Sequence, residues 1–136
     1  MENEDIRWIQ RFQNFSKACI LLAEIKNYKF EDTTPIIREG FIQRFEITFE
    51  LAWKTMKDYL EFEGIRVQPT PRAVIKEAFS TNMIKEGQIF IDMLVARNEM
   101  AHRYDEEVFN KVFIKIQQVF YDAFEELCIF LKSKLV

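Results

Sequence analysis

Apolar residues recur along the chain at intervals of three and four positions, a spacing that places them on one face of an α-helix. In the first such stretch the apolar face is formed by Trp8, Phe12, Phe15, Cys19, Leu22 and Ala23. The same periodicity predicts helices at about 4–26, 35–63, 71–79, 86–100 and 105–134. No stretch alternates apolar and polar residues clearly enough to be a strand. The pattern therefore predicts an all-α fold, an antiparallel helical bundle of about five helices joined by short loops.

Capping residues mark several ends of these predicted helices. Thr34 and Thr70 are each followed by proline, the combination typical of an N-cap and a first helical position. Gly64 is a natural C-terminal stop for the second helix. Asp105, followed by two glutamates, is a good N-cap for the last helix.

Composition adds a size and a core to this pattern. The 136 residues predict a single domain spanning 1–136, and at 49% hydrophobic residues they can build a real core. The chain has no glycine-rich phosphate loop and none of the spaced cysteines and histidines of a zinc site. Fourteen phenylalanines exceed what one narrow core needs, so we expect some to line a subunit interface, where aromatic residues are enriched.

The charge balance limits the way in which this chain could bind nucleic acid. A formal net charge of −3 does not suit a protein that binds nucleic acid through bulk positive charge. It leaves room for a local cationic cleft, formed by Arg97, Arg103 and basic residues of a second subunit, or for a basic partner that docks on this acidic surface. The acidic N-terminus is unlike a signal peptide, and the longest apolar run, 18–23, is too short to span a bilayer. We therefore expect a cytoplasmic protein without membrane association.

Two further groups of residues are candidate sites. Cys19 and Cys128 lie in apolar helical contexts without metal-ligand spacing, which predicts two reduced core thiols. Glu46, Glu50 and Lys54 lie four apart on one helical face, where the carboxylates could bind a divalent metal. A solvated edge with a Glu50–Lys54 pair explains the same spacing more simply. We expect neither a metal nor a cofactor.

The candidate chemistry is concentrated in RNEMAHRY, residues 97–104, where the fourth predicted helix ends and just before the fifth begins. It combines Arg97, Tyr104 and the only histidine of the chain, His102. Residues five apart on a continuous helix face about 140° away from each other. Arg97 and His102 would therefore converge only if the helix ended near residue 100 or 101, and Asp105 favours such an end. We expect His102 and Tyr104 in a short turn that follows Arg97.

Ordinary structural roles for these three side chains remain open. An arginine in a last helical turn complements the helix dipole. A histidine in a polar turn is usually solvated, and a tyrosine beside it packs its ring.

RNEMAHRY resembles the signature motif of HEPN domains. Other segments resemble, in the same order, the HEPN subfamily of nucleotidyltransferase substrate-binding proteins, or HepT-like toxins. They are RWIQRFQNFSKACILL (7–22), FIQRFEITFELAWKTMKDYLEFEG (41–64), PRAVIKEAF (71–79) and GQIFIDMLVARNEMAHRYDEE (87–107). The resemblance covers nearly the whole chain.

The resemblance implies a homodimeric toxin that cleaves RNA without a metal. An imidazole gains and loses a proton near neutral pH, so His102 suits the roles of base and acid, while Arg97 can hold phosphate oxygens. Asn98 can orient the histidine or donate to phosphate. Because each chain has one histidine, a two-fold dimer would provide separate acid and base groups in one cleft.

The resemblance also implies a partner, a cognate minimal nucleotidyltransferase that acts as antitoxin by transferring AMP to Tyr104. The older family name implies a different role, the non-catalytic substrate-binding subunit of a two-component nucleotidyltransferase. A third interpretation is a helical interaction protein whose motif has lost activity.

Overall fold

The computed structural model describes the backbone of residues 2–135 and the side chains of residues 6–135, and within these limits its regular structure is helical. The α-helices are α1 (Glu2–Ala23), α2 (Pro35–Phe62), α3 (Pro71–Ser80), α4 (Gly87–His102), α5 (Glu106–Lys115) and α6 (Tyr121–Lys132). Shorter pieces join them: the 3₁₀ turns η1 (Glu24–Asn27) and η2 (Phe30–Asp32), and the π-helical segment η3 (Ile116–Phe120). The predicted all-α class is confirmed.

The capping residues act as the sequence predicts. The Thr34 hydroxyl accepts a hydrogen bond from the backbone N–H of Ile37, and the Thr70 hydroxyl accepts one in the same way at the start of α3, both at 3.3 Å. Gly64 has a φ of 84°, a left-handed conformation that glycine adopts without strain, and it follows the end of α2. The fifth predicted helix forms one rod from Glu106 to Lys132, in which the π-helical turn η3 separates α5 from α6.

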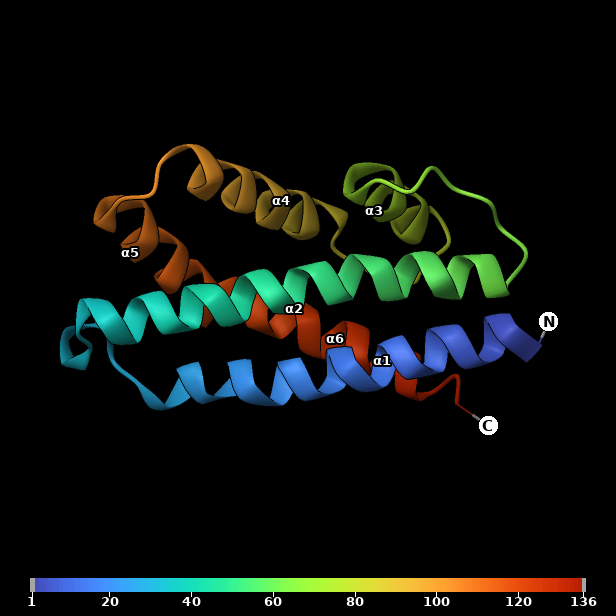
Figure 1. Cartoon of the computed structure of the whole chain (residues 1–136), viewed down its shortest axis with the longest axis horizontal. Helices are drawn as coiled ribbons and strands as arrows, with labels where there is room; N and C mark the ends of the chain where they lie inside the picture. Colours follow the sequence, from blue (N-terminus) through green and yellow to red (C-terminus); the bar gives the residue numbers. More distant parts are fainter. Residues whose placement is uncertain (1, 136) are drawn as a thin grey trace.

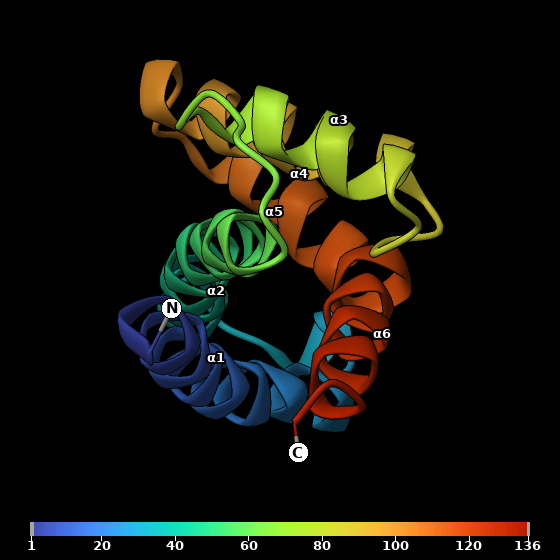
Figure 2. The ribbon, with the colours of Figure 1, turned by 90° about the vertical axis from the view of Figure 1, so that its right-hand side faces the viewer.

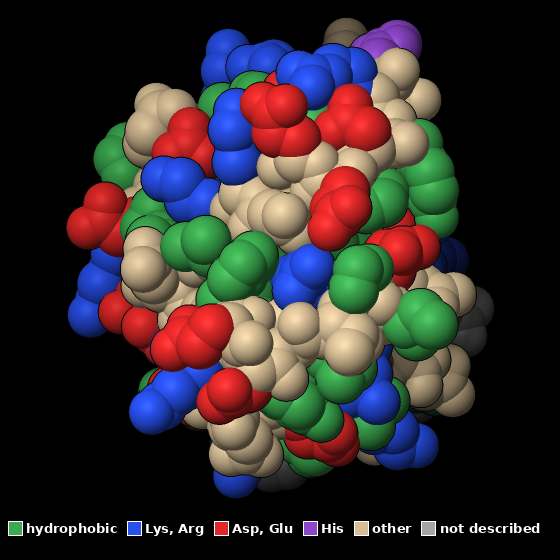
Figure 3. All heavy atoms as spheres, turned by 90° about the vertical axis from the view of Figure 1, so that its left-hand side faces the viewer, with side chains coloured by type: hydrophobic (Ala, Val, Ile, Leu, Met, Phe, Trp, Pro, Cys, Tyr) green, Lys and Arg blue, Asp and Glu red, His purple; other side chains and the backbone are tan. Residues whose placement is uncertain are grey.

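The helices form a bundle with a second layer over it. Helices α1 and α2 lie side by side and antiparallel along their length, and the α5–η3–α6 rod crosses behind them (Figure 1). Helices α3 and α4 lie on the side of α2 away from α1, as the end-on view shows (Figure 2). Helix α4 passes into α5 at the left of Figure 1, and Figure 3 faces this end, where acidic, basic and hydrophobic side chains alternate. No helix within the described residues is long and apolar enough to cross a bilayer.

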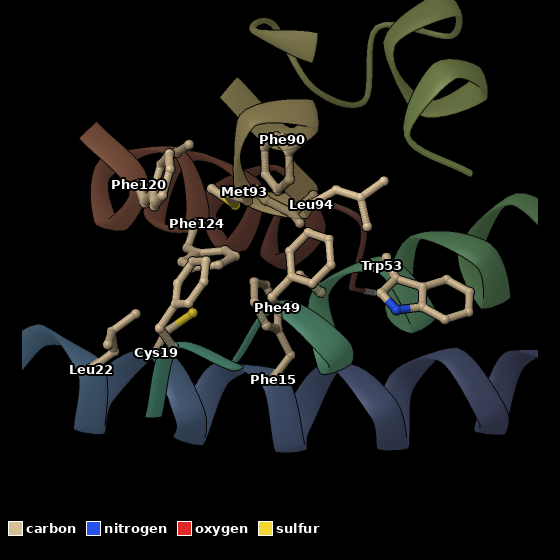
Figure 4. Close-up of a cluster of buried hydrophobic side chains, with 14 of the residues drawn as sticks. Phe15, Cys19, Leu22, Phe49, Trp53, Phe90, Met93, Leu94, Phe120 and Phe124 are labelled. Carbon is tan, nitrogen blue, oxygen red and sulfur yellow. The ribbon is translucent and has the colours of Figure 1, made fainter. Parts of the chain in front are cut away.

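Aromatic side chains from four helices meet in the core. Phe15 of α1, Phe49 of α2 and Phe124 of α6 are completely buried, and Phe90 of α4 joins them from the second layer (Figure 4). The Phe124 ring contacts those of Phe15 and Phe90 edge-on at 6.1 and 6.0 Å between centroids. These contacts fix α4, and with it the candidate motif, against the bundle.

The core uses almost all of the phenylalanine. Ten of the fourteen phenylalanines are buried, and only Phe79 is more than half exposed, at 53%. A single chain therefore buries most of these residues, and a subunit interface could use only the other four. The number of phenylalanines gives no argument for a dimer.

The two cysteines are free, as predicted, but they are not isolated from each other. Cys19 on α1 is buried and Cys128 on α6 is half-buried. The Cys128 thiol donates to the Cys19 sulfur at 3.3 Å. This contact between residues 109 positions apart was not predictable from their separate sequence contexts.

Candidate functional site

The candidate motif lies at the α4–α5 junction, which we define as residues 97–107. Helix α4 runs through His102, two residues beyond its predicted end, and the backbone N–H of Arg103 bonds to the Glu99 carbonyl at 2.7 Å. The prediction that the helix ends near residue 100 was therefore wrong. Met100 is buried and extends the apolar face of α4 by another turn, which favours continued helix. The connecting loop contains only residues 103–105.

This continuous helix separates the two residues that were expected to converge. Because Arg97 and His102 lie five positions apart on α4, their side chains leave the helix about 140° apart. His102 is exposed, whereas Arg97 is half-buried. Within one chain the two side chains therefore leave α4 on different sides.

Arg97 points toward α2, where it forms an ion pair with Glu50. Its Nη2 donates to Oε1 of Glu50, and both side chains are about one-third exposed, at 34% and 33%. The other oxygen of Glu50 accepts a hydrogen bond from the indole N–H of Trp53 at 3.2 Å and lies 3.7 Å from the Lys54 ammonium. The predicted Glu50–Lys54 pair is thus present, but the contact with Arg97 is shorter.

The sequence indicated Glu50 only as a metal ligand or as a partner of Lys54, and its contact with Arg97 was not predicted. Glu50 lies 47 positions from Arg97, and no local spacing indicates that α2 and α4 bring the two together. Within the described residues, no three His, Cys, Asp or Glu side chains are grouped to share a metal ion. The carboxylate that the spacing offered as a metal ligand is instead bound to the candidate catalytic arginine.

Asn98 and Arg103 complete the polar part of the junction. Asn98 is exposed, and its Oδ1 lies 3.5 Å from Nη1 of Arg97, at the limit of hydrogen-bonding distance. Arg103 lies close to three carboxylates, the nearest being Asp105 at 3.2 Å. Asp105 also caps α5 by accepting the backbone N–H of Val108 at 3.0 Å, and this hydrogen bond, with the nearby Arg103, lowers the pKa of its carboxyl.

Tyr104 combines a packed ring with an accessible hydroxyl. Its ring contacts that of Phe109 edge-on, at 4.7 Å between centroids, yet the side chain is 80% exposed. Tyr104 lines a cleft of about 410 Å³ that the first half of α2 closes from the other side with Glu39, Gln43 and Glu46. Burial raises the pKa of the Glu46 carboxyl, and nearby Arg97 partly offsets this shift by favouring the charged form. The cleft beside Tyr104 is therefore lined by acidic rather than basic side chains.

The structure thus brings Arg97 and Asn98 together on one side of the junction and leaves His102 and Tyr104 accessible to solvent. The single histidine is visible as the projecting purple group at the edge of this end of the molecule in Figure 3. An exposed imidazole can accept or donate a proton to a bound molecule, and a fixed guanidinium can bind phosphate oxygens.

Comparison with known proteins identifies relatives along nearly the whole chain. The family model described as "Nucleotidyltransferase substrate binding protein like" matches residues 10–133. A crystal structure of a protein from Thermus thermophilus is similar to this chain with a TM-score of 0.77 and 30% sequence identity, over 87% of this chain and 98% of the other. Among curated proteins, none is similar enough to count as a match. The extent of the family match and the shared helical fold show that this chain belongs to the nucleotidyltransferase substrate-binding-protein-like family of HEPN-like helical bundles.

Proposed function

We propose that this protein is a toxin that cleaves RNA without a metal, at a cleft formed by two copies of the chain. Its partner nucleotidyltransferase silences it by attaching AMP to Tyr104. The observation that carries the proposal is the exposure of the motif: residues 101–104 are all exposed although they adjoin a densely packed core. Side chains that the fold does not bury are available to bind and react.

Membership of this family implies pairing with a nucleotidyltransferase. Attachment of AMP would join the Tyr104 oxygen to the α-phosphorus of ATP, release pyrophosphate and free the phenolic proton. The 80% exposure of Tyr104 supports this role, because another enzyme's active site must reach the hydroxyl. The new phosphodiester would carry one negative charge next to Arg103 and would compete with RNA for cations at the junction.

The direction of the two side chains on α4 supports the proposed dimer. Arg97 and His102 diverge by about 140° on one helix, so one chain alone does not surround a phosphate with both groups. A two-fold axis beside the end of α4 would bring the Arg97 and His102 side chains of both copies around one cleft. Light scattering should then give about twice the 16.4 kDa mass of the chain, and a monomer at micromolar concentration contradicts the shared cleft.

In the proposed reaction the two histidines of the dimer have separate roles. One neutral imidazole removes the proton of a ribose 2′-hydroxyl, whose oxygen attacks the adjacent phosphorus. The two Arg97 guanidinium groups stabilise the negatively charged phosphorane. The second, protonated imidazole gives its proton to the departing 5′-oxygen. The products are a 2′,3′-cyclic phosphate and a 5′-hydroxyl, and each imidazole ends in the protonation state from which the other began.

The alternative is a non-catalytic subunit that holds a substrate for the partner nucleotidyltransferase. Two observations favour it: Arg97 is already paired with Glu50, and the cleft beside Tyr104 is acidic, so neither presents free positive charge to RNA. A protein with this role would not arrest growth when it is produced without its partner, whereas the toxin would.

The decisive experiment compares purified wild-type protein with His102→Ala on structured and single-stranded RNA, in the presence of a metal chelator. We expect wild type to cleave and the variant to lose about 10²–10⁴ in rate, the usual loss on removing a general base or acid. His102 is exposed, so the variant should keep its helicity by circular dichroism. Undiminished cleavage by His102→Ala, or no cleavage and no growth arrest by wild type, excludes the ribonuclease function.

A further inference from the structure

Arg97 is held in place by a carboxylate from a different helix. Its Nη2 donates to Oε1 of Glu50 on α2, and its neighbour Asn98 offers only a contact of 3.5 Å. An arginine side chain is long and loses much rotational freedom when it is fixed, so its partner determines where the guanidinium lies. Glu50 is that partner.

Glu50 is itself held in place by a side chain of the core. Its second oxygen, Oε2, accepts the indole N–H of Trp53, whose side chain is only 8% exposed and packs in the main hydrophobic cluster. Lys54, one helical turn further along α2, lies 3.7 Å from the same oxygen. The two oxygens of Glu50 therefore have separate partners, one turned toward the core and the other toward Arg97.

We propose that Glu50 is a positioning residue, which orients the Arg97 guanidinium so that its remaining N–H groups bind the phosphate of the RNA; the inference rests on the proposed ribonuclease function. Glu50 occupies one N–H of the terminal nitrogen Nη2 and leaves the other N–H groups of the guanidinium for phosphate oxygens. Glu50 does not touch the RNA. It acts through Arg97, and Trp53 acts through Glu50.

A positioning role and a blocking role for Glu50 predict opposite results. If Glu50 fixes a useful geometry, its removal lowers the rate because the guanidinium becomes mobile. If its negative charge only neutralises Arg97, its removal strengthens RNA binding and raises the rate. The contacts favour positioning, because the neutral Trp53 indole holds the Glu50 carboxylate in place without adding a charge to the site.

The test uses Glu50→Ala, Glu50→Gln and Trp53→Phe, with Lys54→Ala as matched control. Glu50→Gln keeps an oxygen acceptor for Arg97, Trp53→Phe keeps the apolar packing but removes the indole donor, and Lys54→Ala removes a neighbouring charge that does not contact Arg97. We expect Glu50→Ala to lower kcat about 10–100-fold, by analogy with the loss when a residue that orients a metal ligand is removed, with a smaller change in KM. Glu50→Gln and Lys54→Ala should keep most of the rate, and Trp53→Phe should lie in between.

A second measurement follows Arg97 itself, by nuclear magnetic resonance of its Nε–Hε group. The group should be ordered in wild type and Glu50→Gln and mobile in Glu50→Ala, while thermal unfolding of Glu50→Ala stays close to that of wild type. Equal Arg97 order in Glu50→Ala and wild type overturns the proposal, as does a rise in cleavage rate in both Glu50 variants. If wild type cleaves no RNA, the ribonuclease function fails, but the resonance measurement still decides whether Glu50 positions Arg97.

Discussion

The bundle core and the α4–α5 junction hold their side chains in place by different interactions. In the core, Phe45 and Phe49 are completely buried, and Asp58, at 2% exposed, has its own cation in Arg11 at 2.9 Å. At the junction, Tyr104 is 80% exposed and Arg103 is shared among carboxylates at 3.2–4.0 Å. Core side chains are thus fixed by packing, whereas most junction side chains are held by solvated ion pairs of low individual energy.

This contrast indicates at which positions a substitution leaves the fold stable. Removing a packed core side chain leaves a cavity, and the cost is large. Removing an exposed junction side chain should cost little stability, even if it abolishes function. Arg97 belongs to both regions, because its partner Glu50 is connected through Trp53 to the core.

The largest loss of stability is expected from Phe49→Ala. Phe49 is completely buried and its ring stacks near that of Phe45 at 6.4 Å, so truncation leaves a cavity among α1, α2, α4 and α6 (Figure 4). Unfolding by urea should show a loss of about 3–5 kcal/mol. Phe79→Ala is the matched control, because Phe79 is 53% exposed, and it should cost about 1 kcal/mol or less. Equal losses in both variants would contradict the burial of Phe49 in the core.

The second effect is a gain of stability in the core, through a disulfide between Cys19 and Cys128. Their sulfurs lie 3.3 Å apart and need to approach to about 2.05 Å. With oxidised glutathione, the more exposed Cys128 would attack first and release one glutathione. Cys19, whose thiol pKa is raised by its hydrogen bond with Cys128 and by burial, would then attack the mixed disulfide and release the second.

A disulfide that closes so long a loop should raise the free energy of unfolding by about 2–4 kcal/mol. Intact-mass measurement should show the loss of two hydrogens, and unfolding should return to its original midpoint after reduction. Cys19→Ser, treated in the same way, should show no gain. If wild type accumulates only mixed disulfides with glutathione, α1 and α6 do not bring the two sulfurs within bonding reach.

Local sequence patterns predicted the helices, because their determinants lie within a few residues of each other. Thr34 and Asp105 cap the helices that follow them, and Gly64 ends α2, through contacts that span only a few positions. The end of α4 was predicted two residues too early. The Asp105 cap marks where the next helix begins, but it does not fix where the previous one ends, and burial of Met100 extends α4.

Local sequence patterns could not predict which side chains contact one another in the candidate site. RNEMAHRY indicated which residues to examine, but the partner of Arg97 depends on how α2 and α4 pack, 47 positions apart. The same limit applies to the contact between Cys19 and Cys128, and to the phenylalanines, most of which the bundle buries. Long-range packing, rather than residue chemistry, is what the sequence did not reveal.

A smaller, pH-dependent effect is expected at Asp105. The hydrogen bond from Val108 and the nearby Arg103 lower the pKa of its carboxyl from an ordinary value of 3.8, so the charged form stabilises the folded protein. This contribution is complete above the unfolded pKa and disappears as pH falls through the lower, folded pKa. Asp105→Asn keeps a neutral cap. The stability difference between wild type and this variant, measured by urea unfolding, should therefore be present at about pH 7 and vanish as the pH falls below 3.8. A difference that stays constant with pH rules out a role of the charge.

The smallest effect on stability, and the sharpest separation of function from fold, is expected for Tyr104→Phe. The substitution keeps the ring that packs on Phe109 and removes only a solvent-exposed hydroxyl. The free energy of unfolding should change by no more than about 0.5 kcal/mol. After incubation with the partner nucleotidyltransferase, ATP and magnesium, wild type should gain the mass of AMP on the peptide that contains Tyr104, and the variant should not.

Tyr28→Phe is the matched control, because Tyr28 is also exposed but lies outside the junction, and this variant should be modified and silenced like wild type. If Tyr104→Phe is modified and inhibited as readily as wild type, the acceptor is another residue. The exposed hydroxyl of the junction then has no part in regulation, and Tyr104 serves only to pack its ring against Phe109.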